Sequence, residues 1–296
     1  MTTDDKNKKA VAVVTGSSSG IGYETSLLLA KNGFFTYATI RNLDKSNKIT
    51  NSKQNERLPI EVLKLDVTDD KSVKEAIKKI VNERRTIDVL VNNAGYALVG
   101  PVEELSTQEF KEQIETNVFG VIRVIKEILP IMRKQRHGII VNISSVAGRT
   151  GFPLTSAYVS SKFALEGLSE SMAYEVEQFG IKVILIEPGV IKTNFDRNLR
   201  IGTGVSTTPT STTNGRDSPY ADITKKRIAG FKPRFENGLP PIEVAKVILR
   251  AITSTSKNVP PDSRYLVGDD AFKLMEIKKS KSDEEFRRLV MEGVLK

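Results

Sequence analysis

The chain has 296 residues, no cysteine, a single histidine (His137) and a formal net charge of +9. The absence of cysteine excludes a disulfide framework, a thiolate nucleophile and a cysteine-ligated zinc site, and a single histidine excludes a multi-histidine centre, so we expect no metal. The positive charge alone would suit nucleic acid, but the densest basic run, Arg133–His137, lacks stacking aromatic residues and lies at an expected helix end, so we expect no nucleic-acid partner.

The N-terminal residues 1–9 are polar and charged and lack the apolar core of a signal peptide. We therefore expect a disordered tail before a single domain over residues 10–296. No run approaches the roughly 20 apolar residues of a membrane-spanning helix. We therefore expect a protein without a membrane-spanning helix. We expect it in the cytoplasm, because the absence of cysteine fits a reducing environment.

Short apolar runs rich in β-branched residues alternate with longer amphipathic segments along the chain. The pattern predicts strands at residues 10–15, 35–40, 60–65, 89–92, 138–143 and 182–186. It predicts helices at residues 23–32, 72–84, 107–135 (one or two helices) and 157–179. Strands without polar alternation are buried on both faces, and their alternation with helices implies parallel βαβ units. The expected fold is therefore α/β, with a doubly wound parallel sheet of the Rossmann type in one domain.

This alternation is interrupted after the sixth strand by Thr203–Gly215, a Ser/Thr-rich run with neither helical nor strand periodicity. Regular patterning returns with a helix at 241–253, a short strand at 264–268 and a surface helix toward residue 296. Because ligands of doubly wound sheets bind beyond the carboxyl ends of the strands, we expect residues 194–238 to form a substrate lid that is mobile without ligand. Its apolar contacts would come from Phe195, Leu199, Phe231 and Phe235. A surface insertion without a role is the alternative.

The first strand runs directly into a glycine-rich turn, Thr15–Gly22. In a βαβ unit the first glycine permits the turn, the second lets the backbone approach a pyrophosphate, and the third lets the helix pack on the sheet. The N-terminus of that helix offers free N–H groups and a positive dipole to the anion. The turn therefore predicts a dinucleotide site formed by Gly16, Ser18, Ser19, Gly20, Ile21 and Gly22.

The end of the second strand indicates which dinucleotide is bound. A site for NAD usually carries an acid there for the ribose hydroxyls, but this chain has Ile40 followed by Arg41. The planar guanidinium of Arg41 suits a 2′-phosphate, so we expect NADP(H) as the cofactor. The alternative is a solvated loop arginine. Since the run Ser17–Ser19 supplies no second cation, the sequence leaves NAD(H) open as a second cofactor.

Tyr158 and Lys162 are four residues apart near the start of a predicted helix, so they share one face. A free tyrosine, with a pKa of about 10, is a poor acid–base catalyst at neutral pH. A lysine cation beside it stabilises the phenolate and lowers that pKa. The pair alone is common and usually structural, and its meaning depends on the motifs around it.

Together these motifs resemble those of the short-chain dehydrogenase/reductase family over residues 11–193, and more weakly to residue 268. Besides the glycine turn, the chain carries Asn-Asn-Ala-Gly at 92–95 and Pro-Gly-x-x-x-Thr at 188–193. Ser145 precedes the tyrosine by the family spacing of its catalytic serine (158 − 145 = 13). The neighbouring Ser144 is the alternative.

The resemblance implies a catalytic set of Asn117, Ser145, Tyr158 and Lys162. Tyr158 would protonate the carbonyl oxygen as hydride arrives, and Ser145 would donate a second hydrogen bond to that oxygen. Lys162 would lower the pKa of Tyr158 and hold the nicotinamide ribose, so both also count as cofactor-binding residues. Asn117, where the family carries its helix asparagine, would position water in a relay to Lys162.

Further cofactor contacts follow from the same resemblance. Asp66 and Val67 would contact adenine, although Asp66 could instead help to cap the helix expected near Thr68. Asn92 would tie neighbouring strands together. The residues that would line the remainder of the cofactor are Asn93, Ala94, Gly95, Pro188, Gly189, Ile191 and Thr193.

These assignments predict an NADP(H)-dependent oxidoreductase that transfers a hydride between nicotinamide and a ketone or secondary alcohol. Four apolar residues expected beside the pocket, Val146, Phe152, Leu154 and Phe195, indicate a hydrophobic small-molecule substrate, and the run before Arg41 resembles NADP-preferring carbonyl reductases and 17β-hydroxysteroid dehydrogenases. One alternative is a 3-oxoacyl-type reductase. The other, a non-catalytic cofactor-sensing protein, is disfavoured by the complete catalytic set. The family also implies a homodimer or homotetramer through the helices at 107–135 and 157–179.

Overall fold

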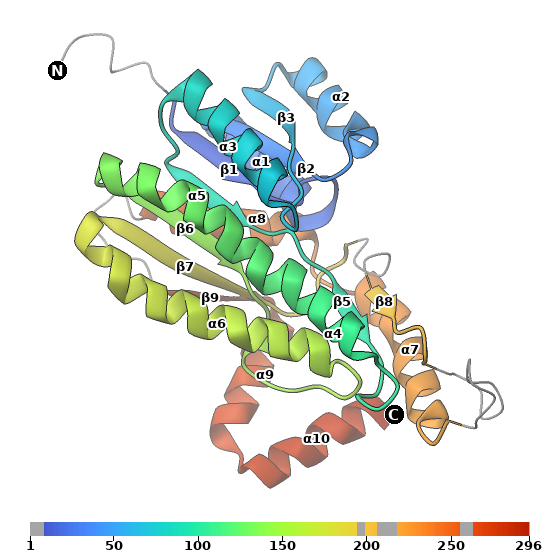
Figure 1. The fold of residues 1–296 in the computed structure, drawn as a ribbon. Helices are drawn as coiled ribbons and strands as arrows, with labels where there is room; N and C mark the ends of the chain where they lie inside the picture. The colour runs from blue at the N-terminus through green and yellow to red at the C-terminus, as the bar shows by residue number, and fades with distance from the viewer. Residues whose placement is uncertain (1–8, 194–198, 206–217, 255–262, 296) are drawn as a thin grey trace.

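The computed structural model describes residues 9–193, 199–205, 218–254 and 263–295 (Figure 1). Its centre is a sheet of seven strands, all paired in parallel. From edge to edge these strands are β3 (Ile60–Lys64), β2 (Phe35–Ile40), β1 (Val11–Val14), β4 (Val89–Asn92), β6 (Gly138–Ile143), β7 (Ile181–Pro188) and β9 (Arg264–Val267). The predicted strands all form. Since the strand order reverses between β1 and β4, a crevice is expected there at the carboxyl ends.

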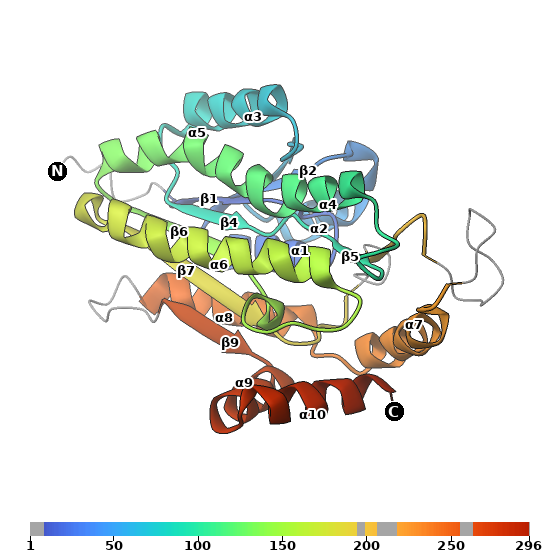
Figure 2. The same cartoon turned by 60° about the horizontal axis from the view of Figure 1, so that its bottom comes forward.

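Helices cover both faces of the sheet, as the two views of the ribbon show (Figures 1 and 2). One face packs against α3 (Asp70–Arg84), α5 (Gly120–Gln135) and α6 (Ser156–Val176). The other packs against α1 (Gly20–Lys31), α2 (Asn47–Glu56) and α8 (Pro241–Ser254). Because both faces of the strands are covered by helices, unbroken apolar runs rather than alternating ones form the centre of the sheet.

The predicted helical segment 107–135 is divided in two by a π-helical turn. It consists of α4 (Thr107–Ile114), the turn at Glu115–Phe119 and then α5. A capping box between Ser106 and Glu109 fixes the start of α4. Short π-helical turns often occur at functional sites, and this one carries Asn117.

Two described α-helices and two described strands were not predicted from the sequence: α2, α7 (Ala221–Glu236), β5 (Ala97–Val99) and β8 (Leu199–Ile201). The strands β5 and β8 form a separate parallel pair, and α7 packs against α10 (Asp283–Leu295), which follows α9 (Asp269–Ser280). Within the described residues, the expected lid is therefore partly regular structure. Phe195, most of the Thr203–Gly215 run and the expected tail except Lys9 lie outside the described residues.

No helix in the described parts of the chain is long and apolar enough to cross a bilayer. All seven strands of the main sheet run in the same direction, so their carboxyl ends meet at one edge. The β5–β8 pair and α7 lie beside that edge (Figure 1). The turns after the strands, this second sheet and α7 thus enclose one region, which holds the candidate site.

Candidate active site

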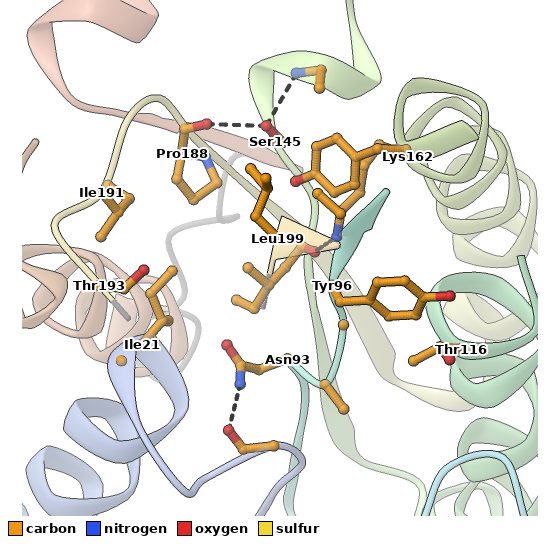
Figure 3. A pocket seen from close by; sticks show the side chains of 18 of the residues that line it. Ile21, Asn93, Tyr96, Thr116, Ser145, Lys162, Pro188, Ile191, Thr193 and Leu199 are labelled. Carbon is orange, nitrogen blue, oxygen red and sulfur yellow. Dashed lines mark hydrogen bonds between the residues drawn. The ribbon is translucent and has the colours of Figure 1, made fainter. Parts of the chain in front are cut away.

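A cavity of about 600 Å³ lies beyond the carboxyl ends of the strands (Figure 3). It brings together all but two of the residues assigned to the site from the sequence. The residues in its wall are Gly16, Ser18, Ser19, Gly20, Ile21, Arg41, Asp66, Val67, Asn93, Ala94, Gly95, Ser145, Tyr158, Lys162, Pro188, Gly189, Ile191 and Thr193. The two exceptions, Gly22 and Asn117, lie behind this wall.

The glycine turn has the close approaches that only glycine allows. Gly16 has a φ of +69°, and a Cβ there would lie 2.8 Å from the Ala94 Cα. A Cβ on Gly22 would overlap the Asn93 side chain and the Gly16 backbone, so Gly22 permits packing rather than ligand contact. Asn93 locks the turn in place by donating its Nδ2 protons to the Thr15 and Gly16 carbonyl oxygens, at 2.9 and 3.0 Å.

The helix α1 begins directly at the end of this glycine turn. Ser19, the residue before the helix, has extended backbone and makes no side-chain cap. The helix begins without an acidic residue in its first turn. Its amide groups and dipole are therefore suited to an external anion such as a pyrophosphate.

A second cation joins Arg41 at the end of β2. Lys45 lies on a short 3-10 turn, Leu43–Lys45, which Asn42 caps by accepting a hydrogen bond from the Asp44 amide at 2.9 Å. Arg41 and Lys45 line the same cavity, and neither makes an ion pair with a described residue. The cavity wall therefore holds a second cation near Arg41 that the sequence analysis did not identify. The Asn-Leu-Asp-Lys turn directly after the strand is the signal that would have identified Lys45.

Asp66 lies in the cavity wall and does not cap the following helix. Its Oδ1 accepts hydrogen bonds from the Thr68 amide and hydroxyl, at 3.0 and 2.8 Å. The cap of α3 is Asp69, which accepts from the Lys71 and Ser72 amides. The alternative that Asp66 caps the helix is therefore wrong.

Ser145, Tyr158 and Lys162 gather at the other end of the cavity. The Lys162 Nζ donates to the Ile143 carbonyl oxygen at 2.7 Å and lies 5.7 Å from the centre of the Tyr158 ring. The Ser145 Oγ donates to the Pro188 carbonyl oxygen at 3.4 Å (Figure 3). Ser144 also lines the cavity, but the hydroxyl that hydrogen-bonds with the Tyr158 phenol is that of Ser145.

The protonation of this pair follows from burial. Burial raises the pKa of Tyr158 to about 12, against the opposing effect of its hydrogen bond with Ser145. Burial lowers the pKa of Lys162 to about 8, and the negative charge of Glu166 opposes that shift. At neutral pH the phenol therefore holds its proton and the lysine is charged, the states that a proton donor and its supporting cation require. The expectation that Lys162 lowers the pKa of Tyr158 is not met, because the pKa is raised and the opposing effect comes from Ser145.

Asn117 lies beside the cavity and makes hydrogen bonds to two neighbouring segments of the chain. Its Nδ2 donates to the Tyr96 carbonyl oxygen and to the Ser161 Oγ, both at 3.0 Å, and its Oδ1 accepts from the Tyr96 amide at 3.2 Å. These bonds tie the segment after β4 to α6, and a role in a water relay stays a prediction. Asn92 joins β4 to β6 through a bond from its Nδ2 to the Asn142 Oδ1 at 2.8 Å, as predicted.

Residues of the second sheet and of α7 also line the cavity. Of the expected apolar residues, Val146, Phe152, Leu199, Phe231 and Phe235 line it. Leu154 does not line it, because the Pro153–Thr155 turn holds that residue at a φ of +62° with its carbonyl oxygen bonded to the Gly100 amide. The sequence analysis missed three cations in this wall, Arg200, Arg227 and Arg234.

Comparison with known proteins agrees with this geometry. The family model for short chain dehydrogenase matches residues 10–203. The oxidoreductase YusZ of Bacillus subtilis is 40% identical over 265 residues, covering 88% of this chain and 90% of the relative. The 3-ketodihydrosphingosine reductase of Bacteroides thetaiotaomicron is 36% identical, covering 84% and 85%. Among solved structures, ElxO with NADP bound superimposes with a TM-score of 0.69 at 31% identity, covering 87% of this chain and 96% of that one.

Proposed function

The chain belongs to the short-chain dehydrogenase family, and on that premise we propose that it is an NADP(H)-dependent oxidoreductase acting on a ketone or secondary alcohol of an apolar compound. The observation that carries the proposal is the composition of a single cavity. Ser145, Tyr158 and Lys162 lie at one end of it, and the glycine turn with Arg41 and Lys45 lies at the other.

The residues present fit a phosphorylated dinucleotide. The turn around Gly16 leaves no room for a Cβ, so backbone atoms form the surface that meets the ligand. The uncapped start of α1 fits the pyrophosphate. Arg41 and Lys45 fit a further phosphate at the ribose, which supports NADP(H) over NAD(H). The NADP-bound neighbour ElxO supports the same choice.

The chemistry then divides between cofactor and protein. Bound nicotinamide supplies the hydride for the carbonyl carbon. As the oxygen gains negative charge, Tyr158 gives it the phenol proton, and the Ser145 hydroxyl donates a second hydrogen bond to it. The Lys162 cation stabilises the phenolate that remains. The product is an alcohol, and the reverse sequence oxidises it.

Two more assignments belong to this proposal. The part of the expected lid that the structure describes, β8 and α7, forms a wall of the cavity, which supports a role in covering the substrate. Large apolar side chains are exposed on α6 and just before α5, namely Phe119, Phe163 and Tyr174. Their exposure supports the homodimer or homotetramer that the family resemblance implies.

The test is oxidation of NADPH and NADH by the purified protein with a panel of apolar ketones, aldehydes and acyl thioesters. We expect turnover with NADPH and at least one apolar ketone, and its loss in the variant Tyr158→Phe. A wild-type protein that reduces no carbonyl compound with either cofactor, while binding NADPH, would favour the cofactor-sensing alternative.

A further inference from the structure

One face of α7 combines two cations with two aromatic rings. Arg227, Phe231, Arg234 and Phe235 occupy positions i, i+4, i+7 and i+8 of the helix, which lie on one side, and all four line the cavity. The rings of Phe231 and Phe235 are stacked, with centroids 6.0 Å apart. Arg200, an exposed residue of β8, also lines the cavity, and its guanidinium lies 4.2 Å from the centre of the Tyr96 ring.

Arg227 is the most confined of these cations. Its residue is 8% exposed, and the buried Nε has no hydrogen-bond partner. The guanidinium lies 4.7 Å from the centre of the Phe231 ring. Burial, with a smaller contribution from the nearby charge of Arg234, lowers the pKa of Arg227 to about 10. A buried cation without an opposing charge is costly, so this site favours an anion.

Each of the carboxylates near this wall accepts a hydrogen bond from a group other than the arginines. Asp270 lines the cavity, but its Oδ2 accepts a hydrogen bond from the Val190 amide at 2.7 Å. Glu103 and Glu104 accept hydrogen bonds from Tyr220 and Ser218, at the start of α7. Among the described residues no carboxylate forms an ion pair with the three arginines of the wall.

On the basis of the proposed function, we propose that the substrate is an amphipathic ketone or alcohol with an anionic group, a carboxylate or a phosphate, that Arg227 binds with help from Arg234 and Arg200. Guanidinium groups bind both anions through paired, charge-assisted hydrogen bonds. The stacked rings of Phe231 and Phe235 would hold the apolar chain that joins this group to the reacting carbon. The α7 face therefore selects the substrate by charge as well as by shape.

The test compares substrates that differ only in this charge. A long-chain oxo acid is measured against its primary amide, and the 4′-phosphopantetheine thioester of a 3-oxo acid against its pantetheine thioester, which lacks the phosphate. We expect wild type to favour at least one charged member by about tenfold to hundredfold in kcat/KM, as loss of a charge-assisted hydrogen bond implies. The pair that shows the preference identifies carboxylate or phosphate as the source of the charge.

Variants then locate the preference. Arg227→Met should bring the ratio for the charged and neutral members close to one, and Arg227→Lys should keep part of it. Lys226→Gln, an equal charge change at an exposed neighbour outside the cavity, should leave the ratio unchanged. A loss of packing alone would affect both members of a pair equally.

Inhibition of the wild type provides a measurement without any variant. Against a neutral ketone, an alkyl carboxylate should compete more tightly than the alkyl amide of the same length. Equal reduction of charged and neutral substrates, together with equal inhibition, would overturn this inference and leave the oxidoreductase assignment intact. Failure to reduce any member of either pair, or any other carbonyl compound, would instead overturn the proposed function.

Discussion

Replacing Lys162 by methionine should stabilise the protein while abolishing its activity. In the folded state burial lowers the pKa of this lysine from 10.5 to about 8, so keeping it charged at neutral pH costs about 3 kcal/mol, at roughly 1.4 kcal/mol per pKa unit. Methionine, of similar length, removes that cost. It also removes the hydrogen bond to the Ile143 carbonyl oxygen, a loss of about 1 kcal/mol. The expected net gain in the free energy of unfolding is about 2 kcal/mol at pH 7.

The pH dependence of this gain is a stricter test. Below pH 8 Lys162 is protonated in both the folded and the unfolded state, so the full cost applies. Between pH 8 and 10.5 the unfolded state binds more protons than the folded state, and the wild type therefore gains stability as pH rises. The advantage of the methionine variant should shrink from about 2 kcal/mol at pH 7 to near zero by about pH 10.

Denaturant unfolding of the cofactor-free protein at the two pH values measures both effects. The control is Lys126→Met, the same substitution at an exposed position of α5, which should change stability by no more than about 0.5 kcal/mol. A Lys162→Met variant that is less stable than wild type at pH 7 would refute the reasoning. So would an advantage that is equal at both pH values.

Four substitutions separate the other roles in the cavity. Tyr158→Phe removes the proton donor but keeps the ring, so kcat should fall at least about a hundredfold with little change in the Kd for NADPH; near-normal turnover contradicts the mechanism. Arg41→Asp should shift the ratio of kcat/KM toward NADH, with a smaller shift for Lys45→Ala, and a wild type that already prefers NADH refutes the phosphate role. Phe231→Ala should raise KM for an apolar ketone. In the wild type, the amide hydrogens of residues 218–238 should exchange more slowly when cofactor and substrate are bound. An unchanged KM together with equal exchange would mean that this segment is a surface insertion without a role.

The sheet could be predicted because its signal is local. Strands buried on both faces require apolar residues at every position, and such runs are visible without knowing the neighbours. Predicted helix boundaries differ from the observed ones by one to three residues. The helix α3, for example, was predicted to begin at residue 72 but begins at Asp70, after its cap Asp69. The three-residue strands β5 and β8 are too short to show a period, and only their pairing makes them strands.

The α7 helix escaped prediction for a different reason. It contains Gly230 and Pro233, residues that disfavour a helix interior, and its outer face is rich in lysine. The helix is stabilised by packing against α10, and such tertiary contacts cannot be read from the local sequence. The sequence motifs located Tyr158, Lys162 and the glycine turn, but not Lys45 or Arg227. Lys45 follows the second strand closely enough for a local signal to place it, whereas Arg227 belongs to the site only because tertiary structure brings α7 to the cavity wall.

The buried charges of the described residues divide by whether they form an ion pair. Glu166 and Glu187 are buried against Arg264, whose Nε lies 3.1 and 3.4 Å from their carboxylate oxygens, so their charges are compensated within the fold. Removing that partner with Arg264→Met should destabilise the protein by about 3 kcal/mol, because two carboxylates lose a partner in a buried site. Lys162 and Arg227 are the buried cations of the described chain, and both line the cavity. Neither of them forms an ion pair with a described carboxylate. By the argument made for Lys162, Arg227→Met should not lower the free energy of unfolding in the same denaturant experiment. A loss as large as that of Arg264→Met would mean that Arg227 supports the fold rather than the substrate.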